Sequence, residues 1–300
     1  MKTQASGAAL VGIASILWAT DALFRVPALA RMNPVMLVFL EHSLALAAML
    51  PFAILVYRRR LFSLTPSAWA AAAGIGAGAS AMATVFFTSS FKFLNPSVVI
   101  LLQKLQPVIC VLLAMLFLKE RPGRRFFLWA PVALVAGLVL SFPGLDLGFV
   151  RGAATWESSG VIYALAAAVL WAGATVAGKV LLAKTSPFQA TFWRFFFGML
   201  TLLVLMLTAG TQVFESGAQI LSDGQNLKTL AYMSLVPGLA AMIAYYAGLA
   251  KTRASIATFV ELLFPLAAVF VNWKWLGSPL SGGQLVAGAI LLVSVTVMAE

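Results

Sequence analysis

Two stretches share one pattern, PSVVILLQKLQPVICVLLAMLFL at residues 96–118 and ASIATFVELLFPLAAVFVNWKWL at residues 254–276. Each is apolar and long enough to cross a bilayer as a helix, which needs roughly 20 residues. Each also carries polar or charged residues shortly before a mid-span proline, Pro107 in the first stretch and Pro265 in the second. Such a proline removes a backbone hydrogen bond and bends or opens the helix, so we predict a hinge at each of them.

The rest of the chain divides in the same way. We predict ten membrane-spanning helices, separated by short polar or proline-marked breaks, at residues 7–29, 34–57, 67–91, 96–118, 126–142, 157–183, 187–209, 227–250, 254–276 and 281–299. An outer-membrane barrel would instead show alternating segments of roughly 10 residues. The first span is too long for a cleavable signal peptide, so we expect it to remain as the first helix. The predicted fold class is all-α integral membrane.

The composition supports this class and excludes others. Of 300 residues, 62% are hydrophobic and 10% charged, whereas a soluble domain has about 45–50% apolar and about 25% charged residues. A single cysteine, Cys110, and a single histidine, His42, exclude an internal disulfide and a multi-histidine metal centre. The sequence has no phosphate-binding glycine loop, so ATP is not expected to power it. We expect neither an enzyme nor a cofactor or metal.

The net charge of +11 is explained by topology. With a cytoplasmic N-terminus, eleven cations lie on that side: Lys2, Arg58, Arg59, Arg60, Lys119, Arg121, Arg124, Arg125, Lys184, Lys251 and Arg253. Five lie on the other: Arg31, Lys92, Arg151, Lys228 and Lys274. Because Lys and Arg favour the cytoplasmic side, we predict a cell (inner) membrane protein with both termini in the cytoplasm, touching membrane lipids and no nucleic acid.

The two halves of the chain resemble each other. Residues 16–42 align with residues 169–195, which pairs Trp18 with Trp171 and Pro34 with Pro187. Five spans per copy is an odd number, so the second copy must be inverted relative to the first. We predict two inverted five-helix repeats, at residues 1–145 and 155–300, an arrangement typical of secondary transporters with a substrate site between the repeats.

Residues 91–122, FKFLNPSVVILLQKLQPVICVLLAMLFLKERP, and residues 244–295 resemble the repeated motif of the drug/metabolite transporter superfamily, EamA type. That motif has a polar or acidic residue before the proline of an apolar helix, then L-x-E-R/P-P. The resemblance implies ten helices and a cavity lined by the first, third, fourth, sixth, eighth and ninth of them. One departure is visible. Many members have Glu before the fourth-helix proline, whereas this chain has Gln103-Lys104-Leu105-Gln106; the ninth helix keeps Glu261.

Six titratable residues fall well within predicted spans: Asp21, Glu41, His42, Lys104, Arg194 and Glu261. A charge at a helix centre costs about 2.5–3.5 kcal/mol, so such residues are rare and usually functional. In one interpretation they line a wet cavity that holds a polar or zwitterionic metabolite, and an acid exchanges a proton. In the other they form fixed salt bridges or extend to the membrane surface. Arg194 is near enough to a helix start to extend in this way, and Arg25 and Lys179 are interpreted as interfacial.

Spacing selects the predicted substrate-binding residues. Trp18 and Asp21 are three apart and share a helix face, as do Gln103 and Gln106. The predicted lining is Trp18, Asp21, Glu41, His42, Gln103, Lys104, Tyr245, Tyr246 and Glu261, with Pro107 and Pro265 as hinges.

The leading hypothesis is a secondary transporter that moves a small polar metabolite by alternating access, as the repeats rock about their prolines. Lys104 favours an amino acid or another carboxylate-bearing solute. Protons are the candidate coupling ion, and the protein is expected as a monomer or homodimer. Two alternatives stay open: an exporter of lipophilic cations or drugs, in which acids dominate the cavity, and a non-transporting membrane scaffold, in which all six charges are bonded to one another.

Overall fold

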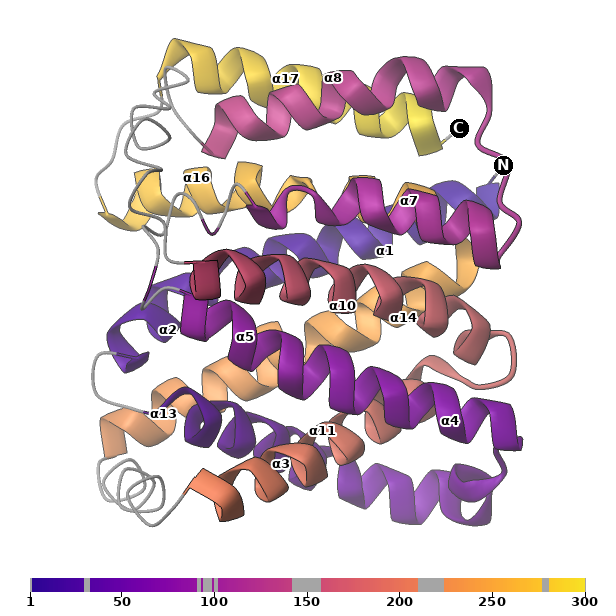
Figure 1. The fold of residues 1–300 in the computed structure, drawn as a ribbon, viewed down its shortest axis with the longest axis vertical. Helices are drawn as coiled ribbons and strands as arrows, with labels where there is room; N and C mark the ends of the chain where they lie inside the picture. The colour runs from indigo at the N-terminus through magenta and orange to yellow at the C-terminus, as the bar shows by residue number, and fades with distance from the viewer. Residues whose placement is uncertain are drawn as a thin grey trace.

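The computed structural model describes residues 2–29, 33–90, 93, 99, 102–141, 158–209, 224–276 and 281–299. These residues form a bundle of helices with no strand among them (Figure 1). The first half contributes α1 (Lys2–Ala19), α2 (Ala22–Leu29), α3 (Pro34–Phe52), α4 (Pro66–Ile75), α5 (Ala83–Ser90), α7 (Gln106–Phe117) and α8 (Arg124–Ser141). The second contributes α10 (Ser158–Leu182), α11 (Pro187–Ala209), α13 (Gly224–Met233), α14 (Ala241–Lys251), α15 (Ala254–Val260), α16 (Leu263–Leu276) and α17 (Gly282–Ala299).

Several helices continue into tighter or wider turns. The 3-10 helix η2 (Arg58–Phe62) follows the π-helix η1 (Ala53–Tyr57) at the end of α3. The π-helix η3 (Gly76–Met82) joins α4 to α5, and the π-helix η6 (Ser234–Ala240) joins α13 to α14. π-helical turns often mark functional sites, and these two interrupt the third and the eighth predicted spans.

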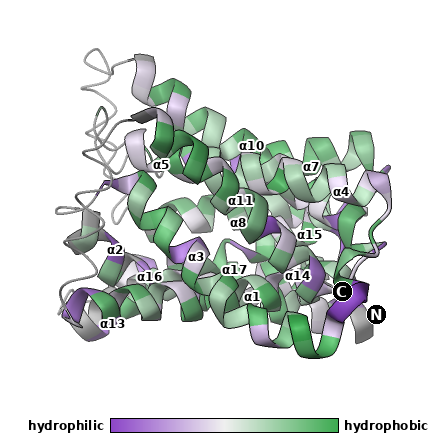
Figure 2. Cartoon of the chain, turned by 90° about the horizontal axis from the view of Figure 1, so that it is seen from below, coloured by the Kyte–Doolittle hydropathy of each residue, from purple (hydrophilic) through white to green (hydrophobic). Residues whose placement is uncertain are grey.

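The helices suit a membrane. Six segments of the described chain are long and apolar enough to cross one: Gln4–Arg25, Pro34–Phe62, Pro66–Ser90, Ser159–Leu182, Pro187–Thr208 and Gly224–Lys251. Shorter apolar helices lie at Gln106–Phe117, Ala254–Ala268 and Gly282–Met298. Figure 2 shows mostly hydrophobic colour along the helices. The all-α membrane fold is therefore confirmed. Every predicted span contains helix, while the count of ten crossings remains a prediction.

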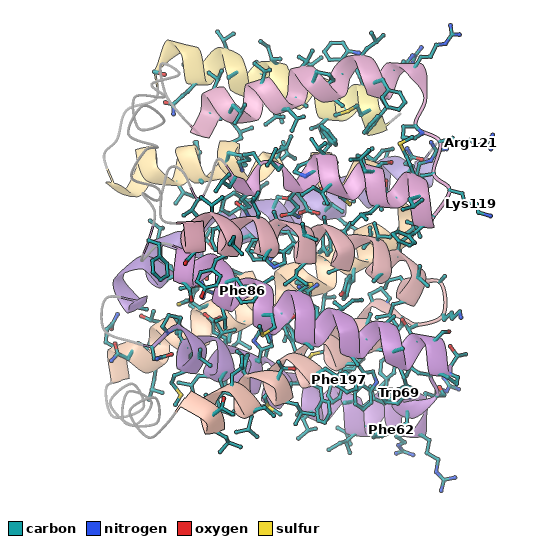
Figure 3. All side chains as sticks on the ribbon, viewed as in Figure 1. Phe62, Trp69, Phe86, Lys119, Arg121 and Phe197 are labelled. Carbon is teal, nitrogen blue, oxygen red and sulfur yellow. The ribbon has the colours of Figure 1, made fainter. Side chains whose placement is uncertain are left out.

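The two termini lie at the same end of the bundle (Figure 1). Lys119 and Arg121 extend away from the helices at that end (Figure 3). This placement agrees with a single basic face. Three of the cations predicted for the opposite side, Arg31, Lys92 and Arg151, lie outside the described residues, as do most of residues 96–101 in the fourth span.

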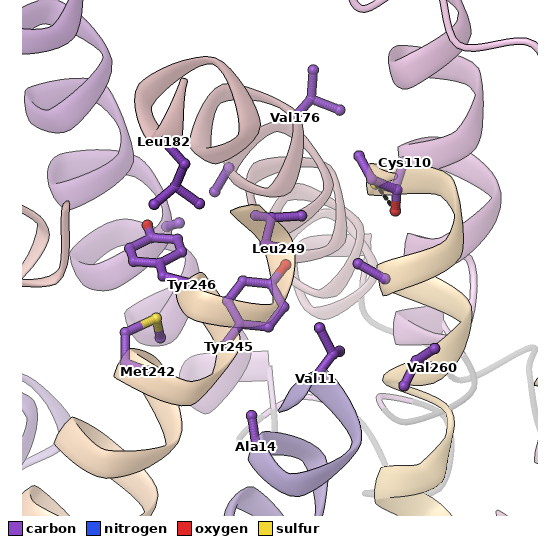
Figure 4. Packing of buried hydrophobic residues seen from close by; sticks show 14 of the residues in the cluster. Val11, Ala14, Cys110, Val176, Leu182, Met242, Tyr245, Tyr246, Leu249 and Val260 are labelled. Atoms are coloured by element: carbon purple, nitrogen blue, oxygen red, sulfur yellow. Dashed lines mark hydrogen bonds between the residues drawn. The ribbon is translucent and has the colours of Figure 1, made fainter. Parts of the chain in front are cut away.

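Helices of the first half pack mainly on helices of the second. Helix α1 packs along α14, α10 along α5 and α7, α11 along α3 and η3, and α8 along α17. Figure 4 shows the α1–α14 contact, where Tyr245 of α14 lies beside Val11 of α1, and it also shows Tyr246 of α14 near Leu182 of α10. Val11 and Tyr246 are fully buried. The core of the protein is thus built across the boundary between the halves.

The first predicted span is broken where the sequence predicted one helix. Thr20 N donates to Leu17 O (3.2 Å) and Asp21 N to Trp18 O (3.0 Å), which are the short bonds of a 3-10 turn. The Thr20 hydroxyl also donates to Leu17 O at 2.7 Å, and such side-chain bonds compete with a regular helix. Asp21 therefore lies in the turn between α1 and α2 rather than in the middle of a helix.

The fourth and ninth spans are broken as well. The turns fall at residues 104–105 and 261–262. In them Leu105 N donates to Leu102 O (3.2 Å) and Phe264 N to Glu261 O (3.0 Å). Pro107 and Pro265 lie in the first turns of the following helices, α7 and α16, where the missing N–H costs little. Each break precedes its proline by two or three residues.

Candidate functional site

The two broken spans meet through their side chains. Gln106, at the start of α7, donates from Nε2 to Glu261 Oε2 at 3.3 Å. Glu261 lies in the turn between α15 and α16. Figure 1 shows α7 in the half of the bundle that holds the termini and α16 in the opposite half. The hydrogen bond therefore links the first half of the sequence to the second, at the points where the fourth and the ninth spans are interrupted.

Tyr245 and Trp18 lie together, as predicted for a shared lining. Their ring centroids are 5.3 Å apart. The Tyr245 hydroxyl also lies 2.8 Å from the Thr175 hydroxyl of α10, and both side chains are buried at 4% exposure. Thr175 was not in the predicted lining. Its signal in the sequence was its place one helical turn after Trp171, the residue that the internal alignment pairs with Trp18.

Lys104 and Glu261 lie close enough to interact electrostatically. No salt bridge within 4.0 Å joins them in the described part of the chain. Lys104 instead places Nζ 5.8 Å from the Phe264 ring centroid, and Glu261 Oε1 is buried without a partner among these residues. Gln103 is half-buried just before the break. We call Trp18, Lys104, Gln106, Thr175, Tyr245 and Glu261 the central group.

Asp21 and Glu41 belong to a separate ionic cluster. Arg25 donates from Nη2 to both Glu41 oxygens, at 2.9 and 3.0 Å, and from Nε to Asp21. The side chains of Arg25, Asp21 and Glu41 keep 24%, 19% and 11% exposure. Arg25, which the sequence placed at the membrane interface, is thus held by two acids, and its depth in the membrane remains a prediction. Trp18 instead contacts Tyr245, so the two residues predicted to share a helix face have different partners.

Arg194 points inward, which corrects the expectation that it extends to the membrane surface. Its Nε donates to Ser80 Oγ at 2.8 Å and its Nη1 to the Tyr246 hydroxyl at 3.2 Å. The residue is only 8% exposed. Ser80 lies in η3, so the widened turn of the third span supplies an acceptor that the sequence pattern did not reveal. The Tyr246 hydroxyl thus binds Arg194, whereas the Tyr245 hydroxyl lies beside Thr175.

His42 is buried but separate from its neighbour Glu41. Its Nδ1 donates to Val38 O at 2.8 Å, because a carbonyl oxygen can only accept. Its ring lies edge-on to Phe195, with the centroids 5.0 Å apart. Its Nε2 is buried and has no partner among the described residues. Glu41 and His42, both in the predicted lining, therefore have different hydrogen-bond partners.

Lys179 has a structural role at the end of the bundle that holds the termini. Its Nζ donates to the carbonyl oxygens of Leu249 (2.7 Å), Ala250 (3.1 Å) and Thr252 (2.6 Å). These bonds cap the C-terminal end of α14, where backbone carbonyls lack helical partners. Lys179 therefore stabilises the corner between α14 and α15 rather than only lying at the interface.

The described residues contain no cluster of three His, Cys, Asp or Glu side chains that could hold a metal ion. The site offers instead the amide of Gln106, the hydroxyls of Thr175 and Tyr245, aromatic rings, and cations without a salt bridge among the described residues. These groups are buried or half-buried. This combination suits recognition of a polar solute by hydrogen bonds, charge and ring contacts.

Comparison with known proteins gives a consistent result. The model of the EamA-like transporter family matches residues 5–142 and again residues 158–299. The riboflavin transporter ImpX of Fusobacterium nucleatum is 29% identical over 98% of this chain and 98% of its own. An uncharacterized transporter of Clostridium kluyveri is 23% identical over 87% of this chain. One solved crystal structure covers 97% of this chain with a TM-score of 0.73 at 18% identity, which shows the shared fold.

Proposed function

The chain belongs to the EamA-like transporter family, and from this we propose that it is a secondary transporter that carries a small polar metabolite across the cell membrane by alternating access. The observation that carries the proposal is the bond between Gln106 and Glu261, which joins two broken spans from opposite halves. In secondary transporters, substrate sites lie at broken helices between inverted repeats. We propose the repeats at residues 1–145 and 155–300, with the breaks before Pro107 and Pro265 as hinges.

The burial of the site supports alternating access. Tyr245 and Thr175 are each 4% exposed, so a solute cannot reach them from water without a change of conformation. Rocking of one half against the other would part the cross-half contact of Gln106 with Glu261 and open a path. We further propose that both termini face the cytoplasm, since the basic residues of the 119–125 loop lie at the end that holds the termini (Figure 3).

The central group favours a solute with both polar and aromatic character. The Trp18 and Tyr245 rings offer a stacking surface, while Lys104 and Glu261 offer a cation and a carboxylate oxygen without a salt-bridge partner in the described chain. The isoalloxazine of riboflavin, the substrate in the name of the Fusobacterium relative, has this character. An amino acid or other carboxylate-bearing solute is the second candidate, since unpaired Lys104 favours an anionic group.

The two alternative functions, an exporter of lipophilic cations and a non-transporting scaffold, are less well supported. An exporter of lipophilic cations needs a site dominated by acids, whereas Lys104 and Arg194 have no acid within 4.0 Å among the described residues. A packed scaffold needs every buried charge to be paired, and the same two residues do not meet that condition.

Counterflow in proteoliposomes tests the proposal. Vesicles loaded with unlabelled riboflavin should accumulate labelled riboflavin transiently, and vesicles loaded with an amino-acid mixture separate the second candidate. We expect Lys104→Ala and Glu261→Ala each to reduce the initial rate at least tenfold, with exposed Arg59→Gln as the matched control. If the wild type transports and both variants transport equally well, the central group is not the substrate site.

A further inference from the structure

Arg194 is a buried cation that forms no salt bridge within 4.0 Å among the described residues, although Glu261 lies close enough to interact with it electrostatically. Arg194 is 8% exposed, and its two hydrogen-bond partners, Ser80 and Tyr246, are neutral hydroxyls. The ion pairs of the described chain all belong to Arg25. A guanidinium has five N–H donors, and these two bonds use Nε and Nη1. A buried charge without a salt-bridge partner is costly, so an anionic or acceptor group of a ligand would complete the surroundings of this cation.

The internal alignment pairs Arg194 with a buried residue that does have a salt bridge. Glu41 and Arg194 occupy equivalent positions, seven residues after Pro34 and Pro187. Glu41 has a full partner in Arg25, which contacts both of its oxygens. In the first half the buried charge is therefore paired by a salt bridge, whereas Arg194 in the second half forms no salt bridge within 4.0 Å among the described residues.

An unpartnered acceptor lies beside the same turn of α11. His42 is 7% exposed, and its unprotonated Nε2 has no partner among the described residues. A Cβ on Gly198, one turn after Arg194, would lie 3.0 Å from this Nε2 and 2.9 Å from Ser80 Cβ. His42 and Ser80 thus flank Gly198, and Ser80 also binds Arg194. An acceptor without a partner among the described residues and a cation without a salt bridge there therefore lie on either side of Ser80.

We propose that Arg194 and His42 bind the head group of the transported solute, a group in which an acceptor oxygen lies next to an N–H. Arg194 binds the oxygen and His42 Nε2 accepts from the N–H. Two sources offer this chemistry: the cyclic imide of an isoalloxazine, and the carboxylate and ammonium groups of an α-amino acid. The inference rests on the proposed transport function and adds the residues and the chemical class that its substrate must match.

A binding experiment separates the two sources. Ligand-induced shifts in melting temperature are measured on purified protein with riboflavin, N3-methylriboflavin, a set of α-amino acids and their N-acetyl forms. We expect the wild type to bind the parent of one series at least tenfold more tightly than the N-substituted form. His42→Ala should abolish this preference. Arg194→Gln should weaken the binding of both the parent and the N-substituted form, and the exposed control Arg121→Gln should change neither. A preference that survives in His42→Ala would overturn the assignment.

A second measurement needs no ligand and separates this inference from the transport function. Arg194→Met with Ser80→Ala and Tyr246→Phe replaces the cation and both of its hydrogen-bond partners by apolar groups of similar shape. If Arg194 is kept for a ligand, the ligand-free triple variant should melt no lower than the wild type, because a costly buried charge has been removed and no buried hydroxyl is left without a partner. Melting clearly below the wild type would mean that Arg194 holds the fold, which overturns the inference even if transport is demonstrated.

Discussion

The contact between Glu120 and the start of α15 gives the sharpest stability prediction. The Glu120 carboxylate accepts from Ala254 N (2.8 Å), Ser255 N (3.1 Å) and Ser255 Oγ (2.6 Å). Ala254 and Ser255 are fully buried. If the carboxylate is removed, these donors have neither a protein partner nor water to replace it, and the first turn of α15 loses its cap.

The expected size follows from the bonds lost. Replacing a helix N-cap by Ala costs about 0.5–2 kcal/mol, and each bond to a charged group contributes about 1.5–3 kcal/mol. Glu120 is half-buried, so solvent screens part of this contribution. We therefore expect Glu120→Ala to lower the free energy of unfolding by about 2–4 kcal/mol. The melting temperature should fall by roughly 5–10 °C in a chain of this size.

Thermal unfolding of the purified protein in detergent, followed by circular dichroism, measures this shift. Glu120→Gln keeps an acceptor oxygen and should give an intermediate loss. Arg121→Ala is the matched control, since its side chain is exposed and extends from the bundle (Figure 3). If Glu120→Ala melts within about 1 °C of this control, the three bonds do not stabilise the junction and the reasoning is refuted.

Three further substitutions test one helix contact, with its control, and one ion pair by the same measurement. A Cβ on Gly248 would lie 2.6 Å from Gly7 O, so Gly248→Ala should push α14 from α1 and cost about 1–3 kcal/mol; Gly74→Ala meets nothing within 4 Å and should be neutral or slightly stabilising. Glu41→Gln removes one of the two carboxylates on Arg25 and should cost about 1–3 kcal/mol; an unchanged melting temperature would show that Asp21 alone satisfies the guanidinium.

The sequence predicted the helical membrane fold well because apolar length is a local property. It did not predict where the helices are interrupted. The break at Thr20 and Asp21 depends on side-chain bonds to the preceding turn. In the fourth and ninth spans the prolines marked the correct region, but each proline begins a helix and the turn precedes it. Spacing rules assume a regular helix, so they fail at such turns.

The candidate site was predicted in part for the same reason. Trp18 and Tyr245 meet, and Glu261 meets Gln106, because these pairs depend on helix order and proline position. Arg194 was expected to extend to the membrane surface because only its distance from a helix end was considered, whereas its side chain points inward. Its partner Ser80 comes from a π-helical turn of another span, and no pattern in a single sequence gives a contact of this kind.

Accessibility of Thr175 from each side of the membrane tests alternating access most directly. Thr175→Cys is prepared with Cys110→Ser, which removes the native thiol, and is treated with a membrane-impermeant thiol reagent in right-side-out and inside-out vesicles. We expect labelling from both sides, slowed by the transported solute, because the buried site must open to each face in turn. Labelling from one side only, or from neither side, would contradict the proposed mechanism.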